Sequence, residues 1–263
     1  MTKKAVMLDA GHYSYYNQSN VLKSYYEGNM SWTLHKLLKK ELEALGIEVG
    51  VTRSKRDDDF YLYNRGYKAK GYDMFVSLHS NWCKDKDVDR VVIIKGYDQP
   101  DKHAKILGEA VSKCMGISKY QVFELENNNG GEYYGVLRGA KAAGVKDRFI
   151  IEHSFHSNLK AAKWLSEESN LEKLAKDEAK AIAKILGVDI NKKTKYVRVI
   201  ADSVNIHNKP SFDSSSVISA VPKGTVLTIV DEIDVPDSKT NMYLTKADIY
   251  ITTSSKYVEV FEK

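Results

Sequence analysis

Three ionisable side chains each follow a short apolar run of the kind that forms a buried strand. They are His12, His79 and Glu152. In an open α/β sheet, ligands bind just beyond the carboxyl ends of the strands. We therefore expect these side chains, although distant in sequence, to meet at one edge of a sheet. Imidazoles and a carboxylate gathered there could bind a metal ion or transfer protons.

A fourth candidate is Glu27, which continues the helical face of Met30 and Leu34. Its carboxylate is therefore expected on the core side of a helix start. A metal ion would satisfy such a carboxylate, which is costly to bury unpaired. Two imidazoles and one carboxylate form many catalytic zinc sites, with the fourth position left to water. The residues thus predict that His12, Glu27 and His79 bind Zn²⁺ and that Glu152 is the base beside it.

Each of these residues also has a simpler interpretation when it is taken alone. A histidine after a strand is usually a satisfied polar residue or a cap. Glu27 could be an exposed residue that favours the helix dipole, and Glu152 could be a buried ion-pair partner. The residues by themselves leave these alternatives open.

The elements that must position these side chains alternate between apolar strands and amphipathic helices. Strands are predicted over 5–8, 47–52, 74–78, 91–94 and 149–151, and helices over 30–45, 61–70, 104–115, 159–168 and 171–186. This alternation predicts an α/β domain, with a mainly parallel sheet covered by helices on both faces.

The character of the chain changes after Gly187. A polar stretch, 191–195, is followed from Tyr196 by short β-branched runs separated by turn residues. We predict two domains, 1–190 and 191–263, the second a small all-β barrel.

Composition bounds the class of protein and its partners. The 263 residues are 43% hydrophobic with a formal net charge of +5, which favours a solvated surface over a nucleic-acid partner. No apolar stretch is long enough to span a membrane, and Asp9 interrupts the first apolar run too early for a secretory signal. We therefore expect synthesis in the cytoplasm and no membrane insertion. The oligomeric state is left open.

Seven blocks follow one another along the chain: Met7-Leu8-Asp9-Ala10-Gly11-His12, Glu27 before a helix, Val51-Thr52-Arg53, Asn64-Arg65, 73–81, Val136-Leu137-Arg138 and 151–158. In this order they resemble zinc-dependent N-acetylmuramoyl-L-alanine amidases of the amidase type 3 family over about residues 3 to 187. The resemblance implies that His12, Glu27 and His79 are the zinc ligands and Glu152 the catalytic glutamate. It also implies cleavage of the amide between N-acetylmuramic acid and L-alanine in bacterial peptidoglycan.

The chain departs from this family at two places near the expected site. The loop after His12 reads Tyr13-Ser14-Tyr15-Tyr16 where many relatives are rich in glycine, and His153 and His156 flank Glu152 where relatives usually have small or apolar residues. We expect His153 to face away from Glu152 and His156 to lie nearer the site. A substrate-contacting role for His156 is a hypothesis.

The remaining histidines lack a partner at ligand spacing. These are His35, His103 and His207, which we predict to be surface residues.

The C-terminal region resembles the bacterial SH3-type wall-binding domain over about residues 196 to 260. The similarity rests on 203–210, 214–218 and 221–227, with His207 where many relatives carry arginine and no tryptophan in the irregular stretch 237–241. The resemblance implies a module that holds the enzyme on the cell wall. A purely structural barrel is the alternative.

Two alternatives to the amidase function remain open, together with the question of where the protein acts. The chain could be a zinc peptidase that cuts the stem peptide, because the same chemistry hydrolyses any amide. It could be a non-catalytic protein that binds cell wall or nucleic acid. As a lytic enzyme without a signal peptide, it would act on the wall after release, as a phage endolysin does through a holin or an autolysin does by mother-cell lysis. We favour the endolysin.

Overall fold

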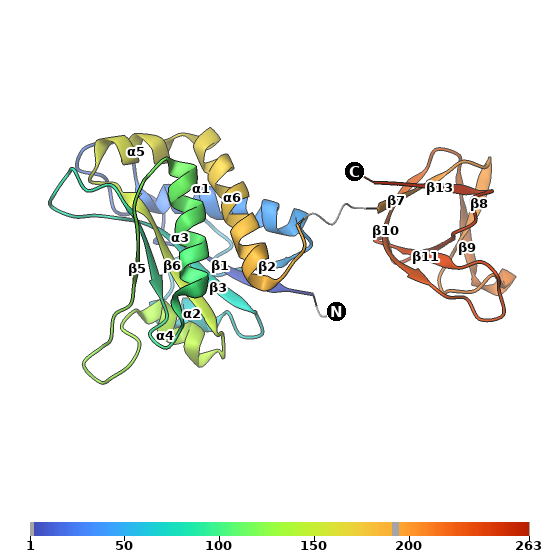
Figure 1. The fold of residues 1–263 in the computed structure, drawn as a ribbon, viewed down its shortest axis with the longest axis horizontal. Helices are drawn as coiled ribbons and strands as arrows, with labels where there is room; N and C mark the ends of the chain where they lie inside the picture. The colour runs from blue at the N-terminus through green and yellow to red at the C-terminus, as the bar shows by residue number, and fades with distance from the viewer. Residues whose placement is uncertain (1–2, 191–194, 263) are drawn as a thin grey trace. The chain divides into compact units, whose positions relative to one another are not determined.

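The computed structural model describes residues 3–190 and 195–262. The chain divides into two compact units, Met1–Ile190 and Asn191–Lys263 (Figure 1). Most of the polar stretch predicted at the boundary, 191–194, lies outside the described residues.

The N-terminal unit is built on a six-stranded sheet with strand order β2-β1-β3-β6-β4-β5. Its strands are β1 (Ala5–Ala10), β2 (Glu48–Val51), β3 (Met74–Asn81), β4 (Val91–Lys95), β5 (Tyr120–Phe123) and β6 (Asp147–Phe155). The first four in that order are parallel, whereas β4 pairs antiparallel with β6 and parallel with β5. The sheet is therefore mixed. The reversal follows from the short connection 82–90, which is too short for a crossover helix, so β4 starts at the edge where β3 ends.

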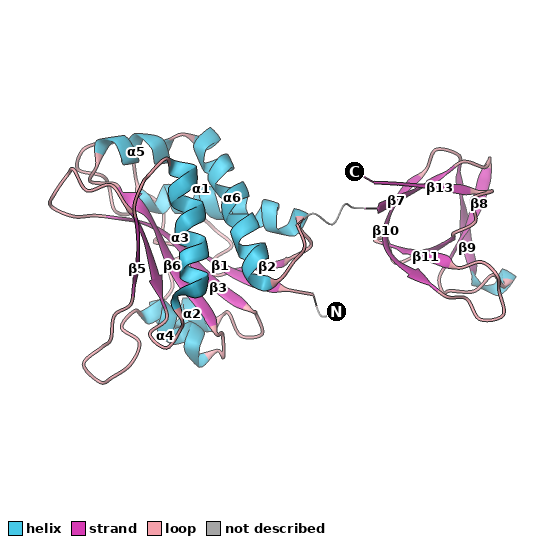
Figure 2. Ribbon diagram, in the orientation of Figure 1, coloured by secondary structure: helices cyan, strands magenta, loops and turns pink. Residues whose placement is uncertain are grey.

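Helices cover both faces of this sheet, as predicted (Figures 1 and 2). They are α1 (Glu27–Ala44), α2 (Leu62–Tyr67), α3 (Asp101–Met115), α4 (Gly135–Ala142), α5 (Leu159–Ser166) and α6 (Glu168–Leu186). Alternate strand residues point to opposite faces. Leu8 and Val76 pack in the core beneath α1, α3 and α6, whereas Met7 and Phe75 pack on the side of α2 and α4.

Two elements of this unit had no predicted counterpart. The helix α4 contains Gly135 and Gly139, which lower its intrinsic helix propensity. The strand β5 has only four residues. Both elements are stabilised by packing rather than by a strong local pattern.

The C-terminal unit is a seven-stranded antiparallel sheet, with order β13-β7-β10-β11-β12-β8-β9 (Figure 2). Its strands are β7 (Lys195–Val199), β8 (Ser203–His207), β9 (Val217–Pro222), β10 (Val226–Ile233), β11 (Met242–Thr245), β12 (Tyr250–Thr252) and β13 (Val258–Glu262). A core of its own forms around Val197, Ile251 and Val258.

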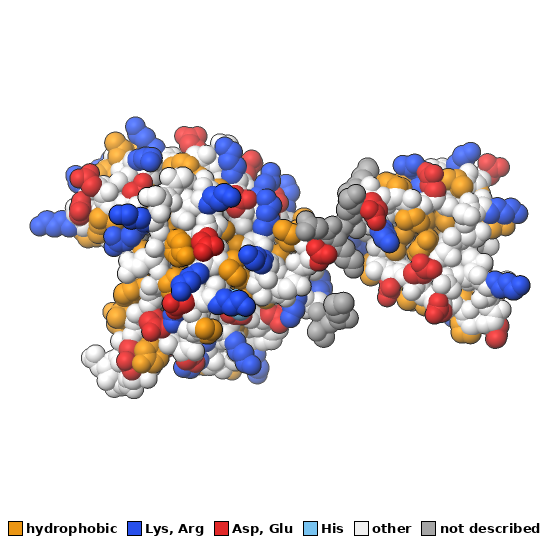
Figure 3. Space-filling view, in the orientation of Figure 1, with side chains coloured by type: hydrophobic (Ala, Val, Ile, Leu, Met, Phe, Trp, Pro, Cys, Tyr) orange, Lys and Arg blue, Asp and Glu red, His pale blue; other side chains and the backbone are white. Residues whose placement is uncertain are grey.

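The surface agrees with the modest net charge. On the face drawn in Figure 3, basic and acidic side chains are interspersed over both units rather than segregated. Among the described residues, none of the helices has both the length and the apolar character needed to cross a membrane.

Candidate metal centre

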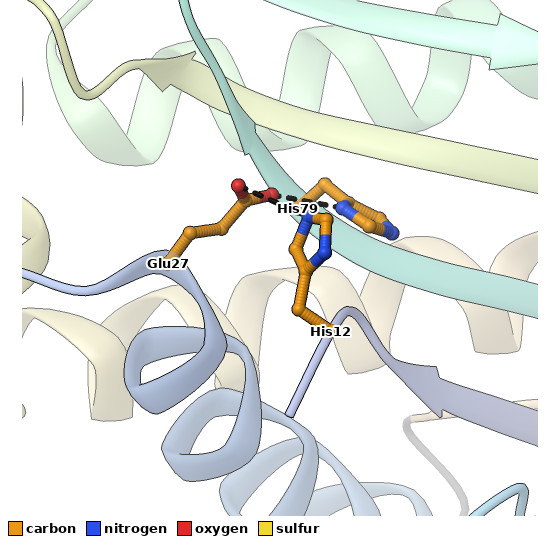
Figure 4. Close-up of side chains that lie close together, drawn as sticks. All are labelled: His12, Glu27 and His79. Carbon is orange, nitrogen blue, oxygen red and sulfur yellow. Dashed lines mark hydrogen bonds and ion pairs between the residues drawn. The ribbon is translucent and has the colours of Figure 1, made fainter. Parts of the chain in front are cut away.

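Three of the four predicted site residues lie together at the sheet edge where β1 and β3 end. His12 follows β1, Glu27 is the first residue of α1, and His79 is in β3 (Figure 4). The Nδ1 atom of His79 lies 2.8 Å from Oε1 of Glu27, and Nε2 of His12 lies 3.2 Å from Oε2. One potential ligand atom from each residue lies within 4.8 Å of the other two. This spacing fits a single metal ion.

Two glycines allow the close approach of these elements. A Cβ atom on Gly11 would lie 2.5 Å from Cε1 of His79, so only glycine leaves room for the imidazole. A Cβ atom on Gly28 would lie 1.9 Å from the carbonyl oxygen of Tyr13, so the loop after His12 can pack directly on the start of α1. His12 itself has a left-handed φ of 59°, a conformation that the surrounding structure must hold in place.

Glu27 is buried and ionised. Asn17 donates a 2.5 Å hydrogen bond to Oε2, and the backbone N–H of Ser80 donates a 3.0 Å bond to Oε1. Burial alone would raise the pKa of Glu27, but hydrogen bonds and charge interactions with His12 and His79 outweigh it and hold the pKa well below its usual range. A fixed negative charge therefore lies between the two imidazoles.

The protonation of His79 is set by a buried chain of hydrogen bonds behind it. The Ser77 hydroxyl donates to Oδ2 of Asp9 at 2.6 Å and lies 3.1 Å from Nε2 of His79. Burial opposes ionisation of Asp9, but the Arg65 guanidinium and hydrogen bonds from Ser77 and Thr52 keep its pKa low. Because the hydroxyl proton is committed to this carboxylate, Ser77 can only accept from His79. Nε2 of His79 thus carries a proton, and Nδ1 is the nitrogen that can lose its proton to a metal ion.

The same nitrogen faces the Glu27 carboxylate. Nδ1 of His79 lies 2.8 Å from Oε1 of Glu27, so it donates a hydrogen bond to the carboxylate when it carries a proton. In neutral His79 the lone pair of Nδ1 would face the carboxylate, and a metal ion between the two atoms would take the place of the proton. The residues therefore fit a divalent metal with a preference for nitrogen and oxygen ligands, such as zinc, held by His12, Glu27 and His79.

Glu152 lies on the neighbouring strand, in register with His79 across the β3–β6 pair. Its Oε2 atom is buried and, among the described residues, has no hydrogen-bond partner. Burial raises the pKa of the Glu152 carboxyl well above its usual range, and the nearby Glu27 carboxylate raises it further. A carboxyl group in this position can hold a proton that an ordinary glutamate would release.

His153 and His156 point away from solvent. His153 faces away from Glu152, as expected, with Nδ1 2.7 Å from the His79 carbonyl oxygen and Nε2 2.5 Å from Glu178 in α6. His156 is fully buried, with Nδ1 3.0 Å from the Ser80 carbonyl oxygen. Among the described residues, its Nε2 atom has no hydrogen-bond partner, and a role of His156 in contacting the substrate or transition state stays a hypothesis that the kinetics of His156→Ala would test.

Two of the three predicted surface histidines are buried, so that prediction was wrong for them. His35 packs against the Trp32 ring, with Nδ1 2.6 Å from the Trp32 carbonyl oxygen. His207 lies 2.8 Å from the Ser216 hydroxyl in the C-terminal unit. His103 is partly exposed, as predicted, and its Nδ1 lies 2.7 Å from Oδ1 of Asp147.

Sequence reasoning missed the residues that support the cluster, namely Asp9, Asn17, Ser77 and Ser80. A signal for one of them was available. Ser77 precedes His79 by two positions in a strand and must share its face. The sequence showed Asp9 only as the residue that interrupts an apolar run. Its contact with Ser77 could not be predicted, because this contact depends on the register between β1 and β3.

The fold and this cluster agree with a known family of enzymes. The family model for N-acetylmuramoyl-L-alanine amidase matches residues 6–184, and the chain belongs to that family. This membership supports a hydrolase that acts on amide bonds of peptidoglycan.

A relative along the whole length is the endolysin of Bacillus phage SPP1. It is 28% identical over 284 residues, which cover 99% of each chain. Two solved structures are similar to the N-terminal fold. The catalytic domain of the amidase CwlV from Bacillus (Paenibacillus) polymyxa var. colistinus has a TM-score of 0.60 at 20% identity, covering 71% of this chain and 99% of that one. The amidase CwlD from Clostridioides difficile, solved with the GerS lipoprotein, has a TM-score of 0.57 at 23% identity, covering 71% and 100%.

Proposed function

We propose that this protein is a zinc-dependent N-acetylmuramoyl-L-alanine amidase that cleaves the bond between N-acetylmuramic acid and L-alanine in peptidoglycan. The observation that carries the metal assignment is the convergence of Nδ1 of His79 and Nε2 of His12 on the Glu27 carboxylate, at 2.8 and 3.2 Å. Membership of the amidase family supports the choice of substrate.

The chain's own residues have separate roles in this mechanism. His12, Glu27 and His79 hold the ion, and zinc in such a site supplies a Lewis acid for the amide carbonyl and lowers the pKa of water. Glu152 accepts the proton of the attacking water and delivers it to the leaving amine. Its raised pKa suits the second step, because the carboxyl must keep the proton until the amine takes it.

We propose that the C-terminal unit is an SH3-like module that holds the enzyme on its insoluble substrate. Its antiparallel sheet and separate core support an independent module. The match to the phage endolysin along 99% of both chains supports a role in lysis after release from the producing cell.

Digestion of purified cell walls with and without a chelator tests the catalytic assignment. We expect soluble peptides with a free N-terminal alanine, identified by mass, and loss of this release when the metal is removed. Cleavage within the stem peptide would instead identify a peptidase. Binding without release of any product would identify a non-catalytic wall protein.

The anchoring role has its own test. The fragment 191–263 should sediment with walls of a susceptible host, and the fragment 1–190 should sediment less. An isolated C-terminal fragment that stays in the supernatant with every wall tested would contradict the anchoring role.

A further inference from the structure

Three exposed tyrosines lie in the loop that joins the two metal-site residues His12 and Glu27. Tyr13, Tyr15 and Tyr16, here called the tyrosine platform, are 38%, 65% and 42% exposed. The ring of Tyr16 stacks on the ring of His12, with centroids 4.6 Å apart, and the Tyr13 ring lies 4.9 Å from that of Tyr16. Tyr16 and Tyr13 therefore continue outward from a proposed metal ligand, and Tyr15, whose ring meets that of Tyr26 edge-on at 5.2 Å, is the most exposed ring of the same loop.

The backbone of this loop is firmly held although its rings are exposed. The backbone N–H groups of Gly28 and Glu27 donate to the carbonyl oxygens of Tyr16 and Asn17, at 3.2 and 3.1 Å. The backbone N–H of Tyr15 donates to Oδ1 of Asn29 at 3.1 Å. These bonds hold two non-glycine residues, Tyr15 and Asn17, in the left-handed region, with φ of 54° and 57°.

The backbone conformation of this loop and the exposure of its rings both lower the stability of the fold. Left-handed tyrosine and asparagine residues strain the backbone, and exposed aromatic rings give up the stabilisation that burial would provide. Strained residues and exposed apolar clusters are concentrated at sites that bind ligands. Rings that are already ordered lose little entropy when a ligand binds.

The chemistry of the platform fits an uncharged ligand with flat apolar faces and hydroxyl groups. A tyrosine ring offers an apolar face and a hydroxyl that donates and accepts hydrogen bonds. A sugar ring offers C–H groups on its faces and hydroxyls at its rim. The Arg56 guanidinium lies over one face of the Tyr15 ring, 5.2 Å from its centroid, so this ring offers a ligand its other face and its hydroxyl.

We propose that the tyrosine platform binds the sugar rings that flank, along the glycan strand, the N-acetylmuramic acid whose amide bond is cut. This assignment rests on the proposed function, because it assumes a substrate in which a sugar lies next to the scissile bond. It makes the loop after His12 the part of the site that recognises the glycan.

The test uses the full-length chain with Tyr13→Leu and Tyr15→Leu, which keep apolar volume and remove the ring, and the corresponding phenylalanine variants, which keep the ring. Tyr16 is left unchanged because it contacts His12. Tyr67→Leu is the control: Tyr67 is 43% exposed and ends α2, outside the loop that joins His12 and Glu27.

Two soluble substrates separate sugar recognition from chemistry: a single N-acetylmuramoyl peptide and a peptide-bearing strand of several disaccharides. For the strand, we expect each leucine variant to raise KM about two- to tenfold, the range of aromatic stacking energies, with kcat retained. The single-sugar substrate should be affected less, the phenylalanine variants should retain most of the wild-type KM, and Tyr67→Leu should match the wild type. Zinc content, measured in parallel, should be equal in all variants.

The outcomes distinguish the two proposals. Wild-type kinetics for both leucine variants on both substrates would overturn the glycan platform and leave the amidase intact. Equal losses on both substrates, or a loss that follows the length of the peptide rather than of the glycan, would also overturn it. If the wild-type enzyme releases no peptide with an N-terminal alanine from either substrate, the amidase assignment itself fails.

Discussion

The hydroxyl oxygen of Ser77 lies 3.1 Å from Nε2 of His79, on the side of the imidazole away from Glu27. Because Asp9 takes the hydroxyl proton, this contact selects the tautomer in which Nδ1 can bind a metal. Ser77→Ala should therefore weaken zinc binding about 10- to 100-fold. A competition titration with a chromogenic chelator measures this directly. Ser112→Ala, a buried serine in α3, is the matched control, and unchanged zinc affinity in Ser77→Ala would refute the role.

Glu152 should be needed for turnover and not for metal binding. Glu152→Gln keeps the shape of the side chain but cannot exchange a proton, so hydrolysis of purified wall should slow about 10²- to 10⁴-fold while zinc content stays at the wild-type level. Glu109→Gln, on the exposed side of α3, should retain full activity. Near-normal hydrolysis by Glu152→Gln would remove Glu152 from the mechanism.

The buried pair of His153 and Glu178 makes a prediction about stability. His153→Leu leaves the Glu178 carboxylate without its histidine partner in the core, which should lower the free energy of unfolding by about 3–5 kcal/mol. The double variant His153→Leu/Glu178→Leu should recover most of this loss, because no charge then remains buried. Urea unfolding of the metal-free proteins measures both. A double variant no more stable than the single one would show that the pair acts in some other way.

His35 gives the protein a dependence on pH that does not involve the metal centre. Burial lowers the pKa of His35 from 6.5 to about 4. Folding therefore favours the neutral form of His35. Its contribution to the free energy of unfolding is complete above pH 6.5 and is lost as the pH falls from 6.5 to about 4. The full loss is about 3 kcal/mol.

His35→Asn cannot titrate and should flatten the fall in stability across this range. The free energy of unfolding, measured in the presence of a chelator at several pH values, checks this. Only its slope against pH is compared, so a constant difference in stability between the variant and the wild type does not matter. Parallel slopes for the variant and the wild type would exclude His35 as the source.

Sequence reasoning placed the site better than it placed the whole fold, and for a physical reason. The ends of β1, β3 and β6 are set by local apolar runs, so His12, His79 and Glu152 could be assigned to one edge without tertiary knowledge. The direction of β4 is not encoded in its own residues, since an apolar run forms either kind of pair. Direction depends on the short connection 82–90 that leads into it.

The burial of His35 and His207 could not be predicted from the sequence. His35 lies in the middle of α1, and we predicted it to be a surface residue. It is covered by the Trp32 ring, and Arg53 from the loop after β2 lies over that ring. The burial of His207 likewise depends on Ser216, from a separate turn. Trp32 lies on the same helix as His35, but the contacts of Arg53 and Ser216 come from other elements, and they leave no periodic pattern around the histidines themselves.

The contact between Gly28 and the Tyr13 carbonyl fixes the path of the loop through its backbone alone. The side chains at positions 13 and 15 contribute nothing to that contact, so their identities can change while His12 and Glu27 keep their places. Ligand recognition can therefore diversify independently of the catalytic chemistry. For protein engineering, this loop is the place to redirect the enzyme toward a different cell wall, provided that Gly28 is retained.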